Sequence, residues 1–133
     1  MISGLRKRIA RGNSEGGFTL IELLVVIIII GILLAIAIPS YLKFRDRANE
    51  SAAKANVRAS VPGLEAYYAD NNTYAGMGLP QLTLIDAGVR LNSASGTASG
   101  YTLCAISGAY KATVNGPGGT ISAVKVSGTP ACP

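Results

Sequence analysis

One stretch of the sequence decides the fold: residues 16–39 read GGFTLIELLVVIIIIGILLAIAIP. From Leu23 to Ile38 every residue is apolar except Gly31. At about 1.5 Å per residue, a helix over residues 18–38 spans roughly 31 Å, which matches the hydrocarbon thickness of a bilayer. A chain of 133 residues is too small to surround such a helix on all faces. The stretch therefore predicts a helix that needs a membrane, or something that replaces a membrane, around it.

The composition of the whole chain is compatible with a folded protein. Hydrophobic residues make up 49% of the chain and charged residues 14%, which argues against a disordered, charge-rich protein. The net charge of +5 owes most to four cations that precede the apolar stretch and face one acid, Glu15: Arg6, Lys7, Arg8 and Arg11. A basic flank keeps its own end in the cytoplasm and sends the following chain outward. Without aromatic neighbours, these cations are a poor nucleic-acid site.

Glu22 places a carboxylate inside the apolar stretch. An ionisable residue within a membrane is costly and is a functional candidate by default. The alternative is an ordinary secretory signal that is cleaved at the small residues Ala35-Ile36-Ala37. That alternative gives Glu22 no role.

The string GGFTLIELL, residues 16–24, resembles the class III signal sequence of type IV pilins and the related pseudopilins. In that family the prepilin peptidase, a membrane aspartic peptidase, cuts after the glycine and methylates the new N-terminal phenylalanine. The resemblance implies that residues 1–17 are a cytoplasmic leader, that the bond after Gly17 is cut, and that Phe18 becomes N-methylated. Pro39 also stands where such pilins have a proline. The likeness is specific over residues 1–45 and is one of architecture beyond them.

The resemblance also implies a role for Glu22 in assembly. Cleavage creates an ammonium at Phe18, one helical turn before Glu22. In a filament, Glu22 would pair with the Phe18 ammonium of a neighbouring subunit, and this contact would set the axial register. Leaving either charge alone in apolar surroundings costs several kcal/mol. Pilin helices lose hydrogen bonding in the filament near this region, and Gly31 and Pro39 allow such a break because proline lacks an amide donor.

Beyond Pro39, the sequence predicts that the helix continues to about Asp70 with two apolar stripes. The stripe expected to pack against the protein's own sheet consists of Val57, Val61, Leu64 and Tyr68. The second stripe is expected to face neighbouring subunits, unless its alanines merely favour helix formation; it consists of Tyr41, Phe44, Ala48, Ala52, Ala55 and Ala59. Pro62-Gly63 predicts a kink or a restart of the helix.

The remainder, residues 71–133, predicts a small globular β domain. Strands are expected within residues 82–91 and over residues 101–106, 110–114 and 121–126, with a flexible loop over residues 93–100. The predicted class is α+β: a long N-terminal helix, residues 18–70, packed on a small antiparallel sheet. Within that helix, residues 18–38 form the transmembrane segment and later the filament core.

Cys104 and Cys132 are the chain's only cysteines. A domain outside the cytoplasm lies in an oxidising space, which favours a disulfide between them. Such a bridge resembles the disulfide-bounded C-terminal loop of many type IV pilins. The alternatives are two free thiols or a metal site, and a metal site finds little support because the chain has no histidine.

The sequence offers no catalytic site, so we expect neither enzyme activity nor a cofactor or metal. Acids are scattered, and the glycine-rich residues 116–119 lack the lysine of a phosphate-binding loop and predict a turn. Five tyrosines could stack on nucleic-acid bases if exposed, but core or subunit contacts are favoured: Tyr67, Tyr68, Tyr74, Tyr101 and Tyr110. Nucleic-acid binding has no other support.

The resemblance implies a structural subunit of a type IV pilus. The precursor would sit in the cytoplasmic membrane with its C-terminal domain outside, and would then polymerise through its N-terminal helix into an extracellular filament for adhesion, motility or DNA uptake. Its implied partners are copies of itself, the prepilin peptidase, and an assembly ATPase with its inner-membrane platform. One alternative is a minor pilin or a type II secretion-like pseudopilin in a short periplasmic filament. Another is an anchored or secreted binding domain that never polymerises.

Overall fold

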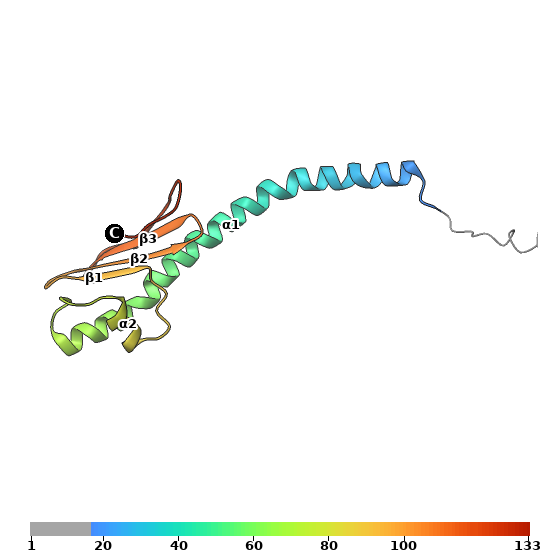
Figure 1. Cartoon of the computed structure of the whole chain (residues 1–133). Coiled ribbons are helices and arrows are strands. Elements are labelled where there is room, and N and C mark those ends of the chain that lie inside the picture. Colours follow the sequence, from blue (N-terminus) through green and yellow to red (C-terminus); the bar gives the residue numbers. More distant parts are fainter. Residues whose placement is uncertain (1–16) are drawn as a thin grey trace, which may run out of the picture. The chain divides into compact units, whose positions relative to one another are not determined.

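The computed structural model describes residues 17–133, so the expected leader lies outside the described residues except for Gly17. Two helices and four strands follow one another along the chain (Figure 1): α1 (Leu20–Asn71), α2 (Leu79–Ile85), β1 (Ser93–Gly96), β2 (Tyr101–Ser107), β3 (Tyr110–Gly116) and β4 (Ser122–Lys125). The chain divides into two compact units, one that ends at Pro39 and one over Ser40–Pro133. Each unit is described by itself.

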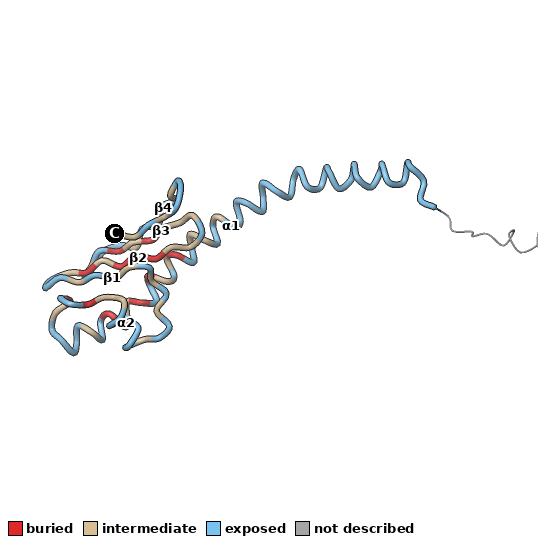
Figure 2. Tube along the Cα trace, viewed as in Figure 1, coloured by how far each residue is buried: buried red, intermediate tan, exposed pale blue. Residues whose placement is uncertain are grey.

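The first unit carries the apolar part of α1. Every residue from Leu20 to Ile38 is exposed, as the uniform pale blue of this part of the tube shows (Figure 2). Within the described residues, α1 is the one helix that is long and apolar enough to cross a membrane. Gly31 and Pro39 lie inside the bounds of α1. Their expected break concerns the filament and stays a prediction.

The second unit begins with the remainder of α1, which ends at Asn71, close to the predicted end. Asn72 stops the helix by adopting the left-handed conformation, with φ of 54°, while its amide donates to the carbonyl of Tyr68 at 2.7 Å. Of the kink or restart expected at Pro62-Gly63, the restart is wrong, because α1 continues as one helix through these residues. The physical reason is packing: residues on both sides of Pro62, Val57 and Leu64, are fully buried and hold the helix on the core.

The sheet is an antiparallel meander with strand order β1-β2-β3-β4. Its register places Ala94 beside Leu103 and Leu103 beside Val114. These side chains face α1 and share one core with it. The expected division of α1 into two stripes is largely confirmed: Val57 and Leu64 are buried and Val61 is partly buried, while the alanine stripe is exposed. Tyr68 lies at the core's edge with its ring centroid 4.5 Å from that of Tyr74.

Two expectations for the chain between the helix and the sheet are wrong. The strand expected within residues 82–91 is absent; the segment from Leu79 to Ile85 is α2. Pro80 in the first turn is compatible with a helix start, and Leu82 is buried whereas Leu84 is exposed. Residues 93–96, expected in a loop, form β1. Gly96 lets the backbone at Tyr74 pack against β1, because a Cβ at that position would overlap the carbonyl oxygen of Tyr74.

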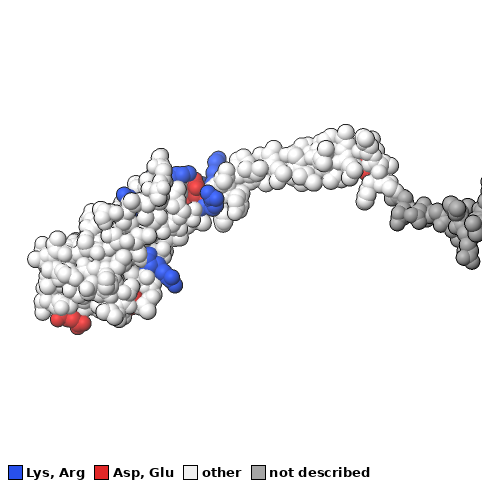
Figure 3. Space-filling model, viewed as in Figure 1, with Lys and Arg blue, Asp and Glu red and all other residues white. Residues whose placement is uncertain are grey.

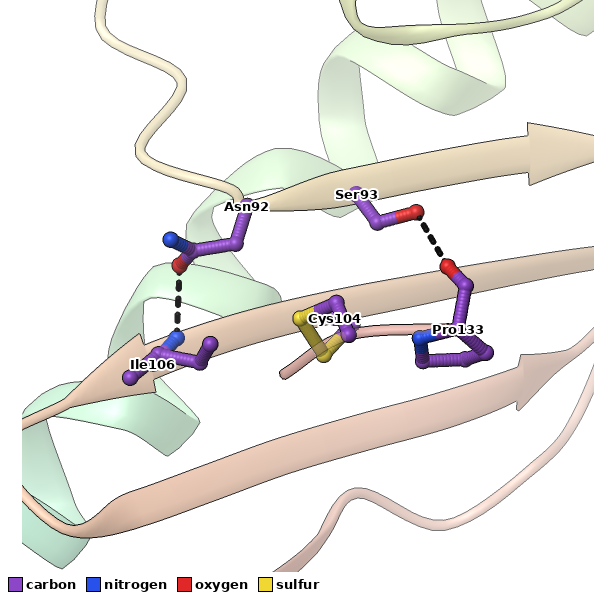
Figure 4. Close-up of a disulfide and its surroundings, with 6 residues drawn as sticks. Asn92, Ser93, Cys104, Ile106 and Pro133 are labelled. Atoms are coloured by element: carbon purple, nitrogen blue, oxygen red, sulfur yellow. Dashed lines mark hydrogen bonds between the residues drawn. A yellow bond between two sulfur atoms is a disulfide. The ribbon is translucent and has the colours of Figure 1, made fainter. Parts of the chain in front are cut away.

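The C-terminal tail is tied to the other face of the sheet. Leu103 and Ala105 point into the core, so Cys104 between them points to the opposite face, where it forms the expected disulfide with Cys132. Next to it, the Ser93 hydroxyl of β1 donates to the carbonyl oxygen of Pro133 at 2.8 Å (Figure 4). The tail therefore returns from the edge strand β4 to β2 and β1. A bridge with a sequence separation of 28 stabilises a fold by roughly 3 to 4 kcal/mol in the chain-entropy account.

An ion pair ties the other end of the sheet to α1. Lys125 of β4 lies 2.5 Å from the carboxylate of Asp46, and its ammonium is 5.9 Å from the centre of the Tyr110 ring. The hydrogen bond to Asp46 is the main reason why the pKa of Lys125 is raised. Burial raises the pKa of two core tyrosines, Tyr74 and Tyr101. Their rings lie 5.0 Å apart and pack edge to face.

The contrast between the two leucines of α2 supplies a test of this core. Leu82 is fully buried and Leu84 is 87% exposed, although both lie in the same short helix. We expect Leu82→Ala to lower the free energy of unfolding by about 2 to 5 kcal/mol because it leaves a cavity, and Leu84→Ala to change it by less than about 0.5 kcal/mol. Urea unfolding of the chain in detergent, followed by tyrosine fluorescence, measures both. Equal effects of the two substitutions would contradict the described core.

Candidate functional site at the start of the apolar helix

The chain enters α1 through three residues that are not helical. Gly17, Phe18 and Thr19 have no regular secondary structure, and α1 begins at Leu20, two residues after the predicted start. Phe18 is 83% exposed. The bond predicted to be cut, between Gly17 and Phe18, therefore lies outside the helix in a segment with an accessible backbone.

Thr19 and Glu22 hold the helix start together. The carboxylate of Glu22 accepts hydrogen bonds from the backbone amide of Thr19 at 2.8 Å and from its hydroxyl at 2.7 Å. In return, the backbone amide of Glu22 donates to the Thr19 hydroxyl at 3.3 Å. This reciprocal arrangement is a capping box, in which two side chains satisfy amide groups that the first turn of a helix leaves without partners.

Thr19 is a functional residue that the predictions from sequence did not include. Its signal is present, because a threonine three residues before a glutamate and ahead of an apolar run is the sequence signature of a capping box. The predictions from sequence considered only the charge of Glu22 and not its ability to cap the helix start. A carboxylate at the N-terminal end of a helix also interacts favourably with the helix dipole.

The structure brings Glu22 to Thr19. In the unprocessed chain, the nitrogen of Phe18 belongs to a peptide bond and carries no charge. The expected pairing between Glu22 and a Phe18 ammonium therefore belongs to the processed chain and stays a prediction. In the unprocessed chain, the Glu22 carboxylate is exposed on the helix surface and accepts its hydrogen bonds from Thr19 of the same chain.

The space around Gly17 is open. A Cβ built at this position meets no atom within 4 Å, and the same holds for Gly31. Within residues 17–133, no atom therefore restricts a side chain at residue 17 sterically.

The cysteines and tyrosines singled out from the sequence lie in the second unit. Cys104 and Cys132 are bonded to each other. Tyr74 and Tyr101 are buried in the core and so offer no exposed face on which a nucleic-acid base could stack. Among residues 17–133, no group of three or more histidine, cysteine, aspartate or glutamate side chains is placed to hold a metal ion.

Known proteins are similar to this segment, and some are similar to much of the chain. Residues 12–38 match the family of the prokaryotic N-terminal methylation motif. The chain is 44% identical over 69 residues to the type IV major pilin protein PilA of Myxococcus xanthus, which covers 51% of this chain and 31% of that protein. It is 40% identical over 62 residues to the type II secretion system core protein G of Pseudomonas aeruginosa, which covers 47% of this chain and 44% of the relative. No solved structure matches the chain.

A third relative aligns over most of both chains. The type IV wide pilus major component PilA4 of Thermus thermophilus is 42% identical over 103 residues, which cover 74% of this chain and 76% of the relative. This likeness extends beyond the shared helix into the globular domain, because 74% of this chain is more than the part that ends with α1 at Asn71. The chain belongs to the family of type IV pilins.

Proposed function

We propose that this chain is the structural subunit of a type IV pilus. The observation that carries the proposal is the 42% identity over 103 residues to a protein named as the major component of a wide pilus. The exposed helix from Leu20 to Ile38 supports it, since a helix that is apolar on every side needs lipid or other apolar helices around it. The chain is first held in the cytoplasmic membrane with its globular domain outside, and then moves into an extracellular filament.

Processing comes before assembly in this proposal. The prepilin peptidase removes residues 1–17 on the cytoplasmic side and methylates Phe18, and an assembly ATPase with its inner-membrane platform extends the filament. The non-helical backbone at Gly17 and Phe18 supports cleavage at this bond, since it is exposed and outside α1. The chain itself has a structural and not a catalytic role. Its filament serves adhesion, motility or DNA uptake.

Glu22 changes partner in the course of assembly. In the precursor, its carboxylate accepts hydrogen bonds from Thr19. In the filament it pairs with the Phe18 ammonium of a neighbouring subunit and sets the axial register, while the helix loosens between Gly31 and Pro39. A charge pair in an apolar filament core tolerates little displacement, because an unpaired charge there costs several kcal/mol.

A second candidate is a pseudopilin of a type II secretion-like system or a minor pilin, which the 40% identity to a secretion core protein favours. Electron microscopy of filaments sheared from the cell surface, with N-terminal sequencing of their subunit, separates the candidates. We expect long filaments whose subunit begins with methylated Phe18. A short periplasmic assembly with the same N-terminus would support the pseudopilin, and an N-terminus at Ile38 would contradict both proposals.

The open space at Gly17 makes the cleavage requirement testable. We expect Gly17→Leu to abolish removal of the leader, because a bulky side chain before the cut bond would collide with the peptidase, whereas the described residues leave room for it. Gly31→Leu is the matched control, since position 31 is equally open. Its leader should be removed at the wild-type rate. The measurement is the mass shift of the chain when it is incubated with membranes that contain the peptidase. Normal processing of Gly17→Leu would contradict the assigned bond.

The two properties of Glu22, cap and charge, can be separated by substitution. Glu22→Gln keeps an oxygen that accepts from Thr19 but removes the charge, whereas Glu22→Ala removes both. If charge sets the register, both variants are processed normally, and both yield less than about a tenth of the wild-type filaments, a loss set by the cost of an unpaired ammonium.

Glu50→Gln is the control for this experiment, because Glu50 is an acid of the same helix that pairs with Lys54 at 2.6 Å. Its filaments should form at the wild-type level. Sheared filaments are quantified per cell, and processing is followed by mass. Wild-type filament yield from Glu22→Gln would show that the hydrogen-bond cap, and not the charge, is what assembly needs.

A further inference from the structure

Positive charge gathers on α1 directly after its apolar half. Lys43, Arg45 and Arg47 follow within nine residues of Ile38, and all three are exposed. Figure 3 shows Lys and Arg side chains clustered over this part of α1, beside a long stretch with hardly any charge. The two ion pairs of the described residues, Lys54 with Glu50 and Lys125 with Asp46, include none of these three cations.

The acids nearest to these cations are already engaged. Asp46 stands between Arg45 and Arg47 in the sequence, but its carboxylate binds Lys125 of β4 at 2.5 Å. The next acid along the helix, Glu50, binds Lys54. The three cations are therefore available for an anion that the described part of the chain does not provide.

The three cations flank the side of the helix that faces the sheet. At about 100° per residue, Asp46 lies on the same side as the buried residues Ala53 and Val57. On the same scale, Lys43 and Arg47 lie to one side of that line and Arg45 lies to the other. The globular domain covers none of them, so all three side chains reach the surroundings of the helix.

Two aromatic residues accompany the cations. Tyr41 is 65% exposed and Phe44 is 72% exposed, although both are large and apolar. Aromatic side chains at the end of an apolar helix are typical of the interface between hydrocarbon and lipid headgroups, and tyrosine in particular is enriched there. An apolar segment followed by alternating aromatic residues and cations matches the passage from hydrocarbon to headgroups in a bilayer leaflet.

The distances agree with this order. If residues 18–38 fill the hydrocarbon, Tyr41 to Arg47 begin roughly 5 Å and end roughly 14 Å beyond its edge along a helix. The headgroup layer is about 5 to 8 Å thick on each side. Lysine and arginine side chains bend along the helix to place their charges in that layer, so all three cations can reach it.

We propose that Lys43, Arg45 and Arg47 bind the phosphates of anionic lipids in the outer leaflet of the cytoplasmic membrane before assembly. The proposal rests on the membrane-anchored stage of the proposed function. Arginine suits this role because its planar guanidinium binds phosphate oxygens through two parallel hydrogen bonds. The lipid contact holds the subunit at a fixed depth, and entry into the filament has to break it.

The test places a single fluorescent probe beside the cations. The chain has no tryptophan, so Phe44→Trp creates the only one. The full chain with this change is reconstituted into phosphatidylcholine vesicles that contain a fixed fraction of phosphatidylglycerol, with bromine on the acyl chains of either one lipid or the other. Bromine quenches tryptophan over short range, so the leader cations on the opposite side of the bilayer do not contribute.

We expect phosphatidylglycerol to be favoured over phosphatidylcholine at the probe by about fivefold, the factor for one cation near an anionic surface. The preference should fall to about one after Lys43→Gln, Arg45→Gln and Arg47→Gln are combined. It should also weaken at high salt. The matched control removes three other cations of the same domain, by Arg58→Gln, Arg90→Gln and Lys111→Gln, and should keep the preference.

Equal quenching by both lipids in the unaltered probe chain would overturn the proposal. So would an unchanged preference in the variant without the three cations. An unchanged preference in vesicles, together with a loss of surface filaments from cells that carry the same three substitutions, would instead assign the cations to an acidic group of a second copy of this chain. Filaments play no part in the vesicle measurement, so failure of the pilus proposal leaves its outcome unaffected.

Discussion

The apolar surface of α1 between Leu20 and Ile38 is the constraint on which the rest of the molecule depends. Its large side chains are about half exposed or more in the single chain. Full burial of one such side chain is worth about 1.5 to 3 kcal/mol, so this helix is stable only in an apolar environment that other molecules supply. A membrane satisfies that need for one chain, and a bundle of like helices satisfies it for many. The globular domain must therefore fold without using this half of the helix.

The second half of α1 packs one side against the sheet and leaves the opposite side exposed. Its sheet-facing side carries small residues among larger ones, with Ala53, Ser60 and Gly63 next to Val57 and Leu64. Val57 and Leu64 share one core with Leu103 of β2 and Val114 of β3. The one buried hydroxyl on this side of α1, that of Ser60, donates to the carbonyl of Asn56 at 2.8 Å and so leaves no polar group unsatisfied. The alanines on the opposite side are exposed, and each adds only a small apolar side chain to the surface.

Periodicity and composition allowed prediction of most of this architecture. The apolar run, the two stripes of α1, the strands β2 to β4 and the disulfide each follow from a strong local pattern or from a single cysteine pair. The predictions of secondary structure failed where tertiary contacts determine the local structure. The segment Ser93–Gly96 has small, polar residues and forms a strand because β2 offers a partner. The helix does not restart at Pro62, because buried residues on both sides of it pack in one core.

The covalent tie between Cys104 and Cys132 has a mechanical consequence. Tension that enters a subunit through α1 can pull the chain straight only as far as Cys104, because the following residues are closed into a loop with a sequence separation of 28. At about 3.5 Å per extended residue, roughly 100 Å of contour length is withheld from extension. Strands β3 and β4 lie wholly inside that loop. Under load, a filament of such subunits therefore extends less than the full contour length of its chains would allow.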